Sequence, residues 1–364
     1  MKNFLLTLSI FFMLYSGSLF SQAIIIDHNC AKLEPVTESA VNQAKQTLHI
    51  AYGHTSHGSQ LITGMSALIG QTSLNGYKGD IYDWNEGGTD GALDIDDYFG
   101  SGDLGHNGDT SWAPYTRTYL ADNPDVNVVI YSWCGGLSDN TPDGIQTYLD
   151  KMNELEQQYP GVKFVYMTGH ADIWADETVK SGNNQIRNYC RTNNKILYDF
   201  NDIEMYNPDG TYFEFVNDNC DYYDAPGGNL SGNWAEEWRN THTEGVDWYD
   251  CDPAHTDALN GNLKAYAAWW LWCRLAGWEG TGTEIINAEN NFELYPNPVE
   301  NILKIKTNEK ILRIEITDIT GKLVKTEGFS GAYNEINVSD LEPGIYFLNM
   351  DTEKGQNILN FIKK

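Results

Sequence analysis

Strand-like apolar segments alternate with helix-like segments over most of the chain, and this alternation constrains the fold more than any other feature. The strand-like segments are residues 47–52, 126–131, 162–167 and 195–200. Such alternation is typical of a parallel sheet with helices on both faces, so we expect an α/β domain over residues 24–279. Ligands of these sheets bind at the carboxyl ends of the strands, which places the expected site in the loops that follow the segments.

The pattern changes near residue 280. Residues 280–290 are polar and begin with closely spaced glycines, which predicts a linker. In residues 291–364, short runs such as 302–306 and 311–316 alternate apolar and polar side chains and are separated by turn residues. This period of two predicts a small antiparallel β-sandwich at the C-terminus.

Three motifs of this C-terminal region carry a resemblance. In chain order they are Leu294-Tyr-Pro-Asn-Pro-Val299, Asp318-Ile-Thr-Gly-Lys322 and Pro343-Gly-Ile-Tyr-Phe347. With them the region resembles the C-terminal sorting domain of the type IX secretion system. The resemblance implies export across the outer membrane of a Bacteroidetes-type bacterium, a secreted or cell-surface location, and the secretion machinery as a partner. A sandwich that binds carbohydrate is the alternative.

The N-terminus and the charge balance narrow the location and the partners. Residues 1–23 have the positive start, apolar stretch and small residues of a secretory signal peptide. No apolar stretch reaches the roughly 20 residues that a helix needs to span a bilayer, so we expect no membrane span. The net charge of −28, from 23 basic and 51 acidic residues, excludes a general nucleic-acid binder and argues against docking on anionic membranes.

Two motifs at opposite ends of the α/β region predict acyl-transfer chemistry. The first strand-like segment leads into Gly53-His-Thr-Ser-His-Gly-Ser59, a glycine-flanked turn from which Ser56 can act as a nucleophile. Asp252-Pro-Ala-His255 precedes the closing helix-like stretch. In such a turn, Asp252 can orient His255 while its other ring nitrogen takes the serine proton.

The order of these motifs resembles the SGNH (GDSL-like) hydrolases. The resemblance implies Ser56 as nucleophile, His255 as base and Asp252 as the residue that orients it. The family's first block reads Gly-Asp-Ser, whereas this chain has one residue more, and its oxyanion blocks have no clean match. Three residues stay open as oxyanion or substrate contacts: Gly105, Gly135 and Asn140. The resemblance predicts a secreted serine esterase that removes acyl groups from a polysaccharide.

Histidines near the predicted strand ends support a competing hypothesis. His54 and His57 flank Ser56, and His170 with Asp172 follows the third strand-like segment. They are candidates for substrate contacts, and imidazole is a common ligand of zinc. A metal-dependent hydrolase, or a polysaccharide lyase with a histidine base, is therefore an alternative. A third hypothesis is a glycan-binding surface protein without catalysis, because the long loops 85–112 and 207–250 are rich in aromatic and acidic residues.

Cofactors and cysteines complete the predictions. We expect no cofactor; bound calcium is an alternative because several carboxylates cluster in one loop, namely Asp94, Asp96, Asp97, Asp103 and Asp109. The six cysteines are an even number behind a signal peptide, which predicts an oxidising compartment. We predict a Cys220–Cys251 disulfide that fixes the Asp252–His255 turn, with Cys134 and Cys190 free. A Cys134 nucleophile is a minor alternative.

Overall fold

The computed structural model describes residues 23–71, 79–100, 104–280, 292–307, 310–318, 322–328, 335–352 and 355–364. The predicted signal peptide (except Ala23), the predicted linker (except Gly280) and Asp103 lie outside these residues. Among the described residues, no helix combines the length and apolar character needed to cross a bilayer.

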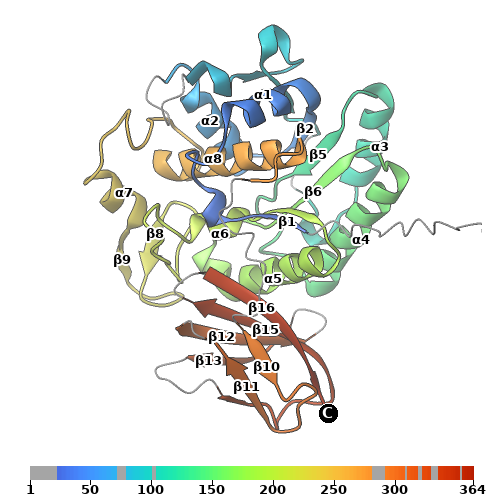
Figure 1. The fold of residues 1–364 in the computed structure, drawn as a ribbon, viewed down its shortest axis with the longest axis vertical. Coiled ribbons are helices and arrows are strands. Elements are labelled where there is room, and N and C mark those ends of the chain that lie inside the picture. The colour runs from blue at the N-terminus through green and yellow to red at the C-terminus, as the bar shows by residue number, and fades with distance from the viewer. Residues whose placement is uncertain are drawn as a thin grey trace, which may run out of the picture.

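A seven-stranded parallel sheet forms the centre of the N-terminal domain (Figure 1). Across the sheet the strands are β1 (Ile24–Ile26), β7 (Ile196–Tyr198), β6 (Lys163–Met167), β5 (Val128–Tyr131), β2 (His49–Gly53), β4 (Leu93–Asp97) and β3 (Trp84–Asn85). All neighbouring pairs are parallel. The α/β class expected from the sequence is confirmed.

The strand order places a topological switch point at the middle of the sheet. From β2 the chain continues to β3 and β4 on one side and then to β5, β6 and β7 on the other. The loops after β2 and β5 therefore leave neighbouring strands in opposite directions. In doubly wound sheets this crevice, at the carboxyl ends of the strands, is where ligands bind.

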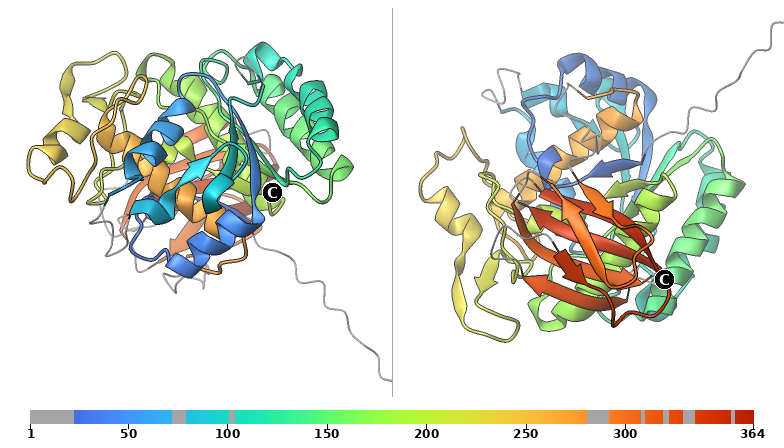
Figure 2. Two further views of the ribbon diagram at one scale, coloured as in Figure 1. Left: turned by 90° about the horizontal axis from the view of Figure 1, so that it is seen from above. Right: turned by 60° about the horizontal axis from the view of Figure 1, so that its bottom comes forward.

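Helices cover both faces of the sheet (Figures 1 and 2). One face carries α1 (Glu38–Thr47), α2 (Ser59–Leu68) and α8 (Ala258–Leu275). The other face carries α3 (Trp112–Asp122), α4 (Pro142–Gln158) and α5 (Asp176–Thr192). Side chains cap several N-termini: Thr37 begins α1, Thr141 begins α4 with Pro142 at its first position, and Asp257 begins α8.

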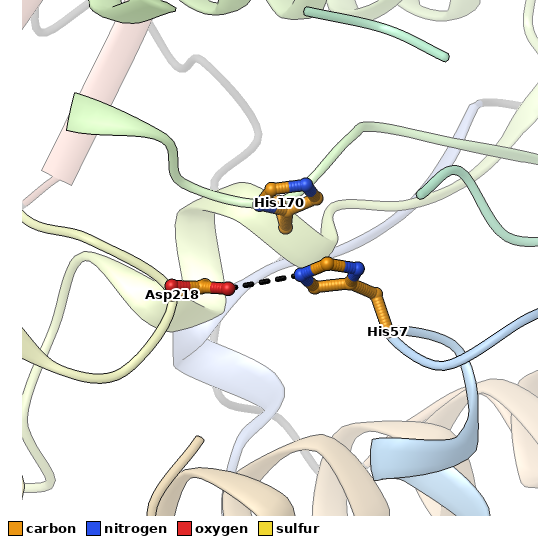
Figure 3. A group of neighbouring side chains, drawn as sticks. All are labelled: His57, His170 and Asp218. Atoms are coloured by element: carbon orange, nitrogen blue, oxygen red, sulfur yellow. Dashed lines mark hydrogen bonds and ion pairs between the residues drawn. The ribbon is translucent and has the colours of Figure 1, made fainter. Parts of the chain in front are cut away.

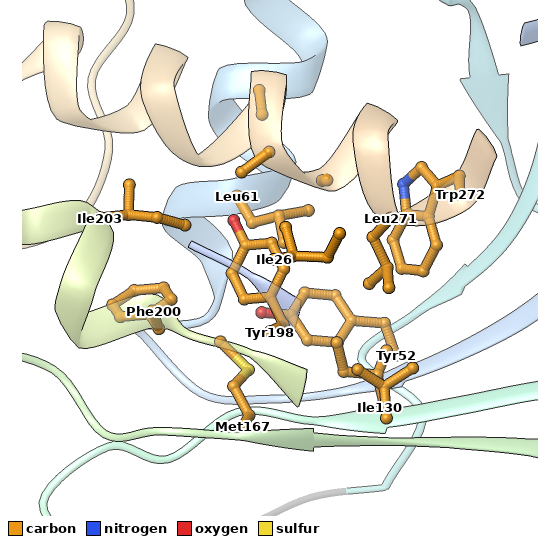
Figure 4. Packing of buried hydrophobic residues seen from close by; sticks show 14 of the residues in the cluster. Ile26, Tyr52, Leu61, Ile130, Met167, Tyr198, Phe200, Ile203, Leu271 and Trp272 are labelled. Carbon is orange, nitrogen blue, oxygen red and sulfur yellow. The ribbon is translucent and has the colours of Figure 1, made fainter. Parts of the chain in front are cut away.

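Nearly every residue of α8 is buried where this helix lies on the sheet (Figure 4). Figure 4 shows Leu271 and Trp272 of α8 against Tyr52 of β2, and all three side chains are buried. Burying a large apolar side chain contributes about 1.5–3 kcal/mol. A Cβ atom on Gly64 of α2 would lie 2.0 Å from the carbonyl oxygen of Gly261 of α8. Glycine at this crossing therefore lets the two helices approach closely.

A long irregular segment connects β7 to α8. It contains α6 (Phe200–Glu204), the hairpin of β8 (Asp221–Tyr223) and β9 (Leu230–Asn233), and α7 (Trp234–Arg239). Short 3-10 helices lie elsewhere in the domain: η1 (His28–Cys30), η3 (Gly79–Tyr82), η4 (Thr89–Gly91), η5 (His106–Gly108) and η6 (Ile173–Ala175).

Two antiparallel sheets form the C-terminal region. One contains β10 (Glu293–Tyr295), β11 (Ile302–Lys306) and β14 (Glu335–Asn337); the other contains β12 (Ile311–Asp318), β13 (Leu323–Gly328), β15 (Gly344–Thr352) and β16 (Gly355–Lys363). Side chains from both sheets share an apolar core that is separate from the core of the first domain. The small antiparallel sheets expected at the C-terminus are therefore present.

The structure contains no Cys220–Cys251 bridge, because neither cysteine is part of a disulfide. Cys220 Sγ lies 3.6 Å from Thr256 Oγ1, and Cys251 Sγ accepts a hydrogen bond from Asn262. The predicted disulfide is thus wrong. We expected this disulfide to fix the Asp252–His255 turn. A hydrogen bond of 2.6 Å from Thr256 Oγ1 to the backbone carbonyl of Asp218 holds the turn instead.

Candidate functional site

Five segments that are distant in sequence meet at the switch point. The loop after β2 carries Ser56 and His57, and the loop after β5 carries Cys134. His170 follows β6, Asp218 precedes β8, and His255 lies in the turn before α8. The loops after β2 and β5 pack tightly, because a Cβ atom on Gly58 would lie 2.7 Å from the Cβ atom of Ser132. Glycine is required at this approach.

His57 joins a thiol to a carboxylate. Its Nδ1 lies 2.9 Å from Cys134 Sγ, and its Nε2 lies 2.9 Å from Asp218 Oδ2. Figure 3 shows the bond between Asp218 and His57, with the ring of His170 above. Both ring nitrogens are occupied from opposite sides, so the imidazole is fixed in orientation. This is the arrangement of a nucleophile, a base and the residue that orients the base.

The pKa values of Cys134, His57 and Asp218 favour an ion pair between the thiol and the imidazole. Burial raises the pKa of Cys134, but the hydrogen bonds from His57, Thr55 and Ser56 and the charge on His57 together outweigh burial and lower that pKa to about 6. Burial lowers the pKa of His57, but the hydrogen bonds with Asp218 and Cys134 and the negative charges of Cys134 and Glu204 together outweigh it and raise that pKa to about 9. Burial raises the pKa of Asp218, but the His57 bond and the nearby positive charges together outweigh it and lower that pKa. Between pH 6 and 9 the pair is therefore thiolate and imidazolium, the nucleophilic form of cysteine.

Ser56 and His255 are in contact with each other beside Cys134 and His57. The Oγ atom of Ser56 lies 2.9 Å from Nε2 of His255 and 3.6 Å from Cys134 Sγ. Two of the three residues of the predicted serine triad are therefore in hydrogen-bonding contact. The third is not, since Asp252 is exposed and makes no hydrogen bond to His255 among the described residues. His255 has a φ of 65°, a left-handed conformation that departs from the turn assumed in the sequence argument.

Three imidazole rings form a stack in the site. The His57 ring is parallel to the His170 ring at 3.7 Å between centroids, with 4° between planes, and lies 4.5 Å from the His255 ring. His170 is buried, and its Nδ1 donates to the carbonyl of Ala171 at 2.8 Å. Partial burial and then the charge on His57 lower the pKa of His255. His57 and His255 therefore favour opposite protonation states.

The predicted metal cluster is only partly assembled. His57 and His170 come together with Asp218, their ligand atoms within 4.8 Å of one another, rather than with His54, Asp172 or Asp252. An imidazole nitrogen binds a metal ion along a lone pair in the plane of its ring. Because the two rings are parallel and face to face, those lone pairs do not point at one ion between them. The arrangement fits proton transfer better than metal coordination.

The calcium hypothesis receives no support from the four described carboxylates. They bind separate protein partners: Asp94 contacts His49, Asp96 contacts Tyr119, Asp97 contacts His54, and Asp109 contacts Ser111. Each carboxylate is thus used locally, and among the described residues they form no common cluster.

Several predicted site residues have local structural contacts instead. His54 is buried between Asp97 and the carbonyl of Thr55. Asp172 accepts hydrogen bonds from the backbone at the start of η6. Asn140 donates from Nδ2 to the carbonyls of Gly105 and Gly136, both at 2.6 Å, so its amide joins two loops.

Gly105 and Gly135 differ in how close they lie to Cys134 in the chain. A Cβ atom on Gly105 would contact the ring of Trp133, and this glycine has a φ of 59°. Its carbonyl is held by Asn140, which gives it a role in loop structure. Gly135, in contrast, follows Cys134 directly in the chain. Of the predicted oxyanion candidates, Gly135 is the one whose backbone adjoins the thiol.

A buried charged network supports two of the site loops. The Lys264 ammonium lies 2.7 Å from Glu204 Oε1, both side chains being fully buried, and also binds Gln60. Glu204 accepts the backbone N–H of Ala171 at 2.5 Å, and Gln60 donates to the carbonyl of Ala254 at 2.6 Å. These bonds hold the residues beside His170 and His255, so one internal ion pair positions both loops.

Comparisons with known proteins identify the C-terminal region. Residues 293–364 match the secretion system C-terminal sorting domain. This region is a type IX sorting domain. The protein is therefore exported by type IX secretion to the cell surface or the extracellular space. A comparison with curated proteins finds no match.

Solved structures resemble the chain only weakly. An endo-β-1,4-mannanase double mutant of Cellulomonas fimi has 12% identity and a TM-score of 0.20, covering 85% of this chain and 59% of its own. The mannanase of Thermotoga petrophila has 9% identity and a TM-score of 0.18, covering 66% of this chain and 47% of its own. The chain thus spans less than two thirds of either, and scores this low carry no argument about fold or activity.

The sorting domain contacts the segment that carries Asp218. Arg313 of β12 forms an ion pair with Glu214, four residues before Asp218 in the chain. Glu315 of the sorting domain accepts a hydrogen bond of 3.5 Å from Asn184 of α5. The contact is polar, which is typical of interfaces between separately folding domains.

Proposed function

We propose that the protein is a secreted acyl hydrolase whose nucleophile is the thiolate of Cys134. The observation that carries the proposal is the hydrogen-bonded chain from Cys134 through His57 to Asp218, with both bonds at 2.9 Å. A thiolate that is formed at neutral pH and lies at a topological switch point meets the requirements for covalent catalysis. The site lies on an α/β fold that also fits a hydrolase.

The chemistry follows from the order of these residues. The Cys134 thiolate attacks the carbonyl carbon of an ester, and the oxyanion receives hydrogen bonds from the backbone N–H groups at Gly135 and Gly136. Donors of this kind contribute about 3 kcal/mol to the transition state. The His57 imidazolium then gives its proton to the leaving alcohol oxygen as the carbon–oxygen bond breaks. A thioester on Cys134 remains, and water hydrolyses it.

We further propose that the substrate is an acylated polysaccharide. Trp174 is 75% exposed and follows His170 closely in the chain, and its ring meets the Tyr223 ring edge-on at 6.2 Å. Exposed aromatic rings offer faces against which the apolar faces of sugars pack. Export to the cell surface or the extracellular space makes an extracellular glycan accessible to this site.

The Ser56–His255 bond favours a second candidate, the serine esterase implied by the SGNH resemblance. In that reaction Ser56 attacks and His255 accepts its proton across the 2.9 Å bond. Two features weigh against it: His255 lacks a carboxylate partner at Asp252, and a more acidic thiol lies 3.6 Å from the serine. The two candidates differ in the atom that carries the acyl group.

The test is to locate that acyl group. Purified protein is mixed with an activated acyl ester and with acetylated glycan, quenched, and analysed by mass spectrometry of its peptides. We expect the adduct on Cys134, and we expect Cys134→Ala to lose hydrolysis by about 10³-fold or more. An adduct on Ser56, or unchanged turnover by Cys134→Ala, would contradict the thiol mechanism. Ser66→Ala, an exposed serine on α2, is the matched control.

A further inference from the structure

The hydroxyl of Ser56 occupies a bridging position that acylation by Cys134 does not use. It lies between the thiol of Cys134, at 3.6 Å, and Nε2 of His255, at 2.9 Å. We propose that Ser56 and His255 form a proton relay that activates the water for hydrolysis of the Cys134 thioester. This inference rests on the thiol mechanism proposed above and assigns a separate role to the second histidine of the site.

The geometry suits a relay to solvent. Ser56 is half-buried beside the thiol, whereas His255 is exposed, so a proton that reaches the imidazole can leave to bulk water. The His255 turn is held on both sides, by Gln60 at the carbonyl of Ala254 and by Thr256 at the carbonyl of Asp218. His255 has a left-handed backbone conformation, and strain of this kind clusters at functional sites.

A second base is needed because His57 favours its charged form. Burial lowers the pKa of His57, and the hydrogen bonds with Asp218 and Cys134 together with the charges of Cys134 and Glu204 raise it; the Asp218 bond and the Glu204 charge remain after the thiolate has been acylated. In the proposed cycle His57 takes up a proton from solvent beside these two carboxylates and is then a poor base toward water. The groups facing His255 are His57, His170 and Asp218, and its pKa lies below the ordinary 6.5, which leaves it neutral at pH 7. Paired groups with opposite shifts mark the acid and the base of a site.

The step balances in atoms and charge. A water oxygen bonds to the thioester carbonyl carbon while one water proton passes to Ser56 Oγ and the Ser56 proton passes to His255 Nε2. The carbon–sulfur bond then breaks, its electron pair stays on Cys134 as thiolate beside the His57 imidazolium, and the carboxylic acid leaves. His255 and the acid release their protons to solvent. No oxidant, reductant or metal ion takes part.

The experiment separates the two halves of turnover. Full-length protein and the variants Ser56→Ala and His255→Gln are mixed rapidly with a p-nitrophenyl ester, and the burst and the steady state are recorded. We expect both variants to keep the burst while the steady-state rate falls by about 10²-fold. Peptide mass spectrometry should then find the thioester accumulating on Cys134. His106→Gln, an exposed histidine paired with Asp139, is the matched control and should keep both phases.

Other outcomes would contradict the proton relay or the thiol mechanism on which it rests. Loss of the burst in folded Ser56→Ala or His255→Gln places these residues in acylation, and unchanged steady-state rates remove them from the reaction. An acyl group on Ser56 in the unchanged protein refutes the thiol mechanism itself, so the two failures are distinct. Thermal melts monitor folding. In the unchanged protein, the steady-state rate should fall as the pH drops through the pKa of His255. The His255→Gln variant should not show this fall.

Discussion

His57 and His255 lie 4.5 Å apart in one stack, yet their surroundings differ in every respect that controls a proton. His57 is buried, bonded to a thiol on one side and to a carboxylate on the other, and favours the charged form. His255 is exposed, bonded to an alcohol, and favours the neutral form. The difference teaches that the burial, charges and hydrogen bonds around each ring decide which histidine favours the charged form and which the neutral form.

Substitution of the carboxylates near the two histidines should have the largest effect on activity among the tests of this comparison. Asp218→Asn removes the charge that stabilises the His57 imidazolium, so we expect hydrolysis to fall by about 10⁴-fold, as for other orienting carboxylates. Asp252→Asn should change hydrolysis by less than about threefold, since Asp252 makes no bond to His255. Steady-state assays of both variants are the measurement. A larger loss in Asp252→Asn would restore the serine triad predicted from the sequence.

Thiol alkylation tests the charge state of the first pair. Iodoacetamide should label Cys134 with a pH midpoint near 6, and the midpoint should move toward the ordinary 9.0 in His57→Gln. At pH 7 this amounts to about a tenfold slower reaction, because nucleophilicity rises partly as the thiolate fraction falls. Burial raises the pKa of each of the other five thiols, to about 12 for Cys220, Cys251 and Cys273, so only one label per molecule is expected at pH 7. Equal labelling of several cysteines would contradict this.

Metal removal should have the smallest effect. The parallel rings of His57 and His170 favour proton transfer over coordination, so we expect activity to change by less than about twofold after treatment with a strong chelator. Elemental analysis of the purified protein, run beside the assay, checks whether any ion was present to remove. Loss of activity that added zinc restores would replace the thiol mechanism with a metal-dependent one.

The fold was more predictable than the site. Apolar periodicity identified the four strands β2, β5, β6 and β7 and the alternating strands of the sorting domain, because burial of a face leaves a pattern in the sequence. The contact between Ser56 and His255 was also anticipated, since both flank elements whose ends converge at the sheet. Export was read correctly from the three C-terminal motifs.

The residues that sequence reasoning missed have no periodic signature. Asp218 is one acid among many in a long loop, and only the folding of that loop brings it to His57. Cys134 was identified as a minor candidate, but its acidity depends on a histidine that lies far from it in the chain. The Asp252 assignment failed because spacing alone does not show the left-handed backbone at His255.

The six cysteines of this exported protein form no disulfide in the structure, and this has a consequence for how the protein is handled. A low-pKa thiolate is the form of cysteine that peroxides attack first, and the reaction proceeds through sulfenic acid to products that reductants do not reverse. The proposed thiol mechanism therefore predicts that protein prepared in air loses activity unless a reductant is present.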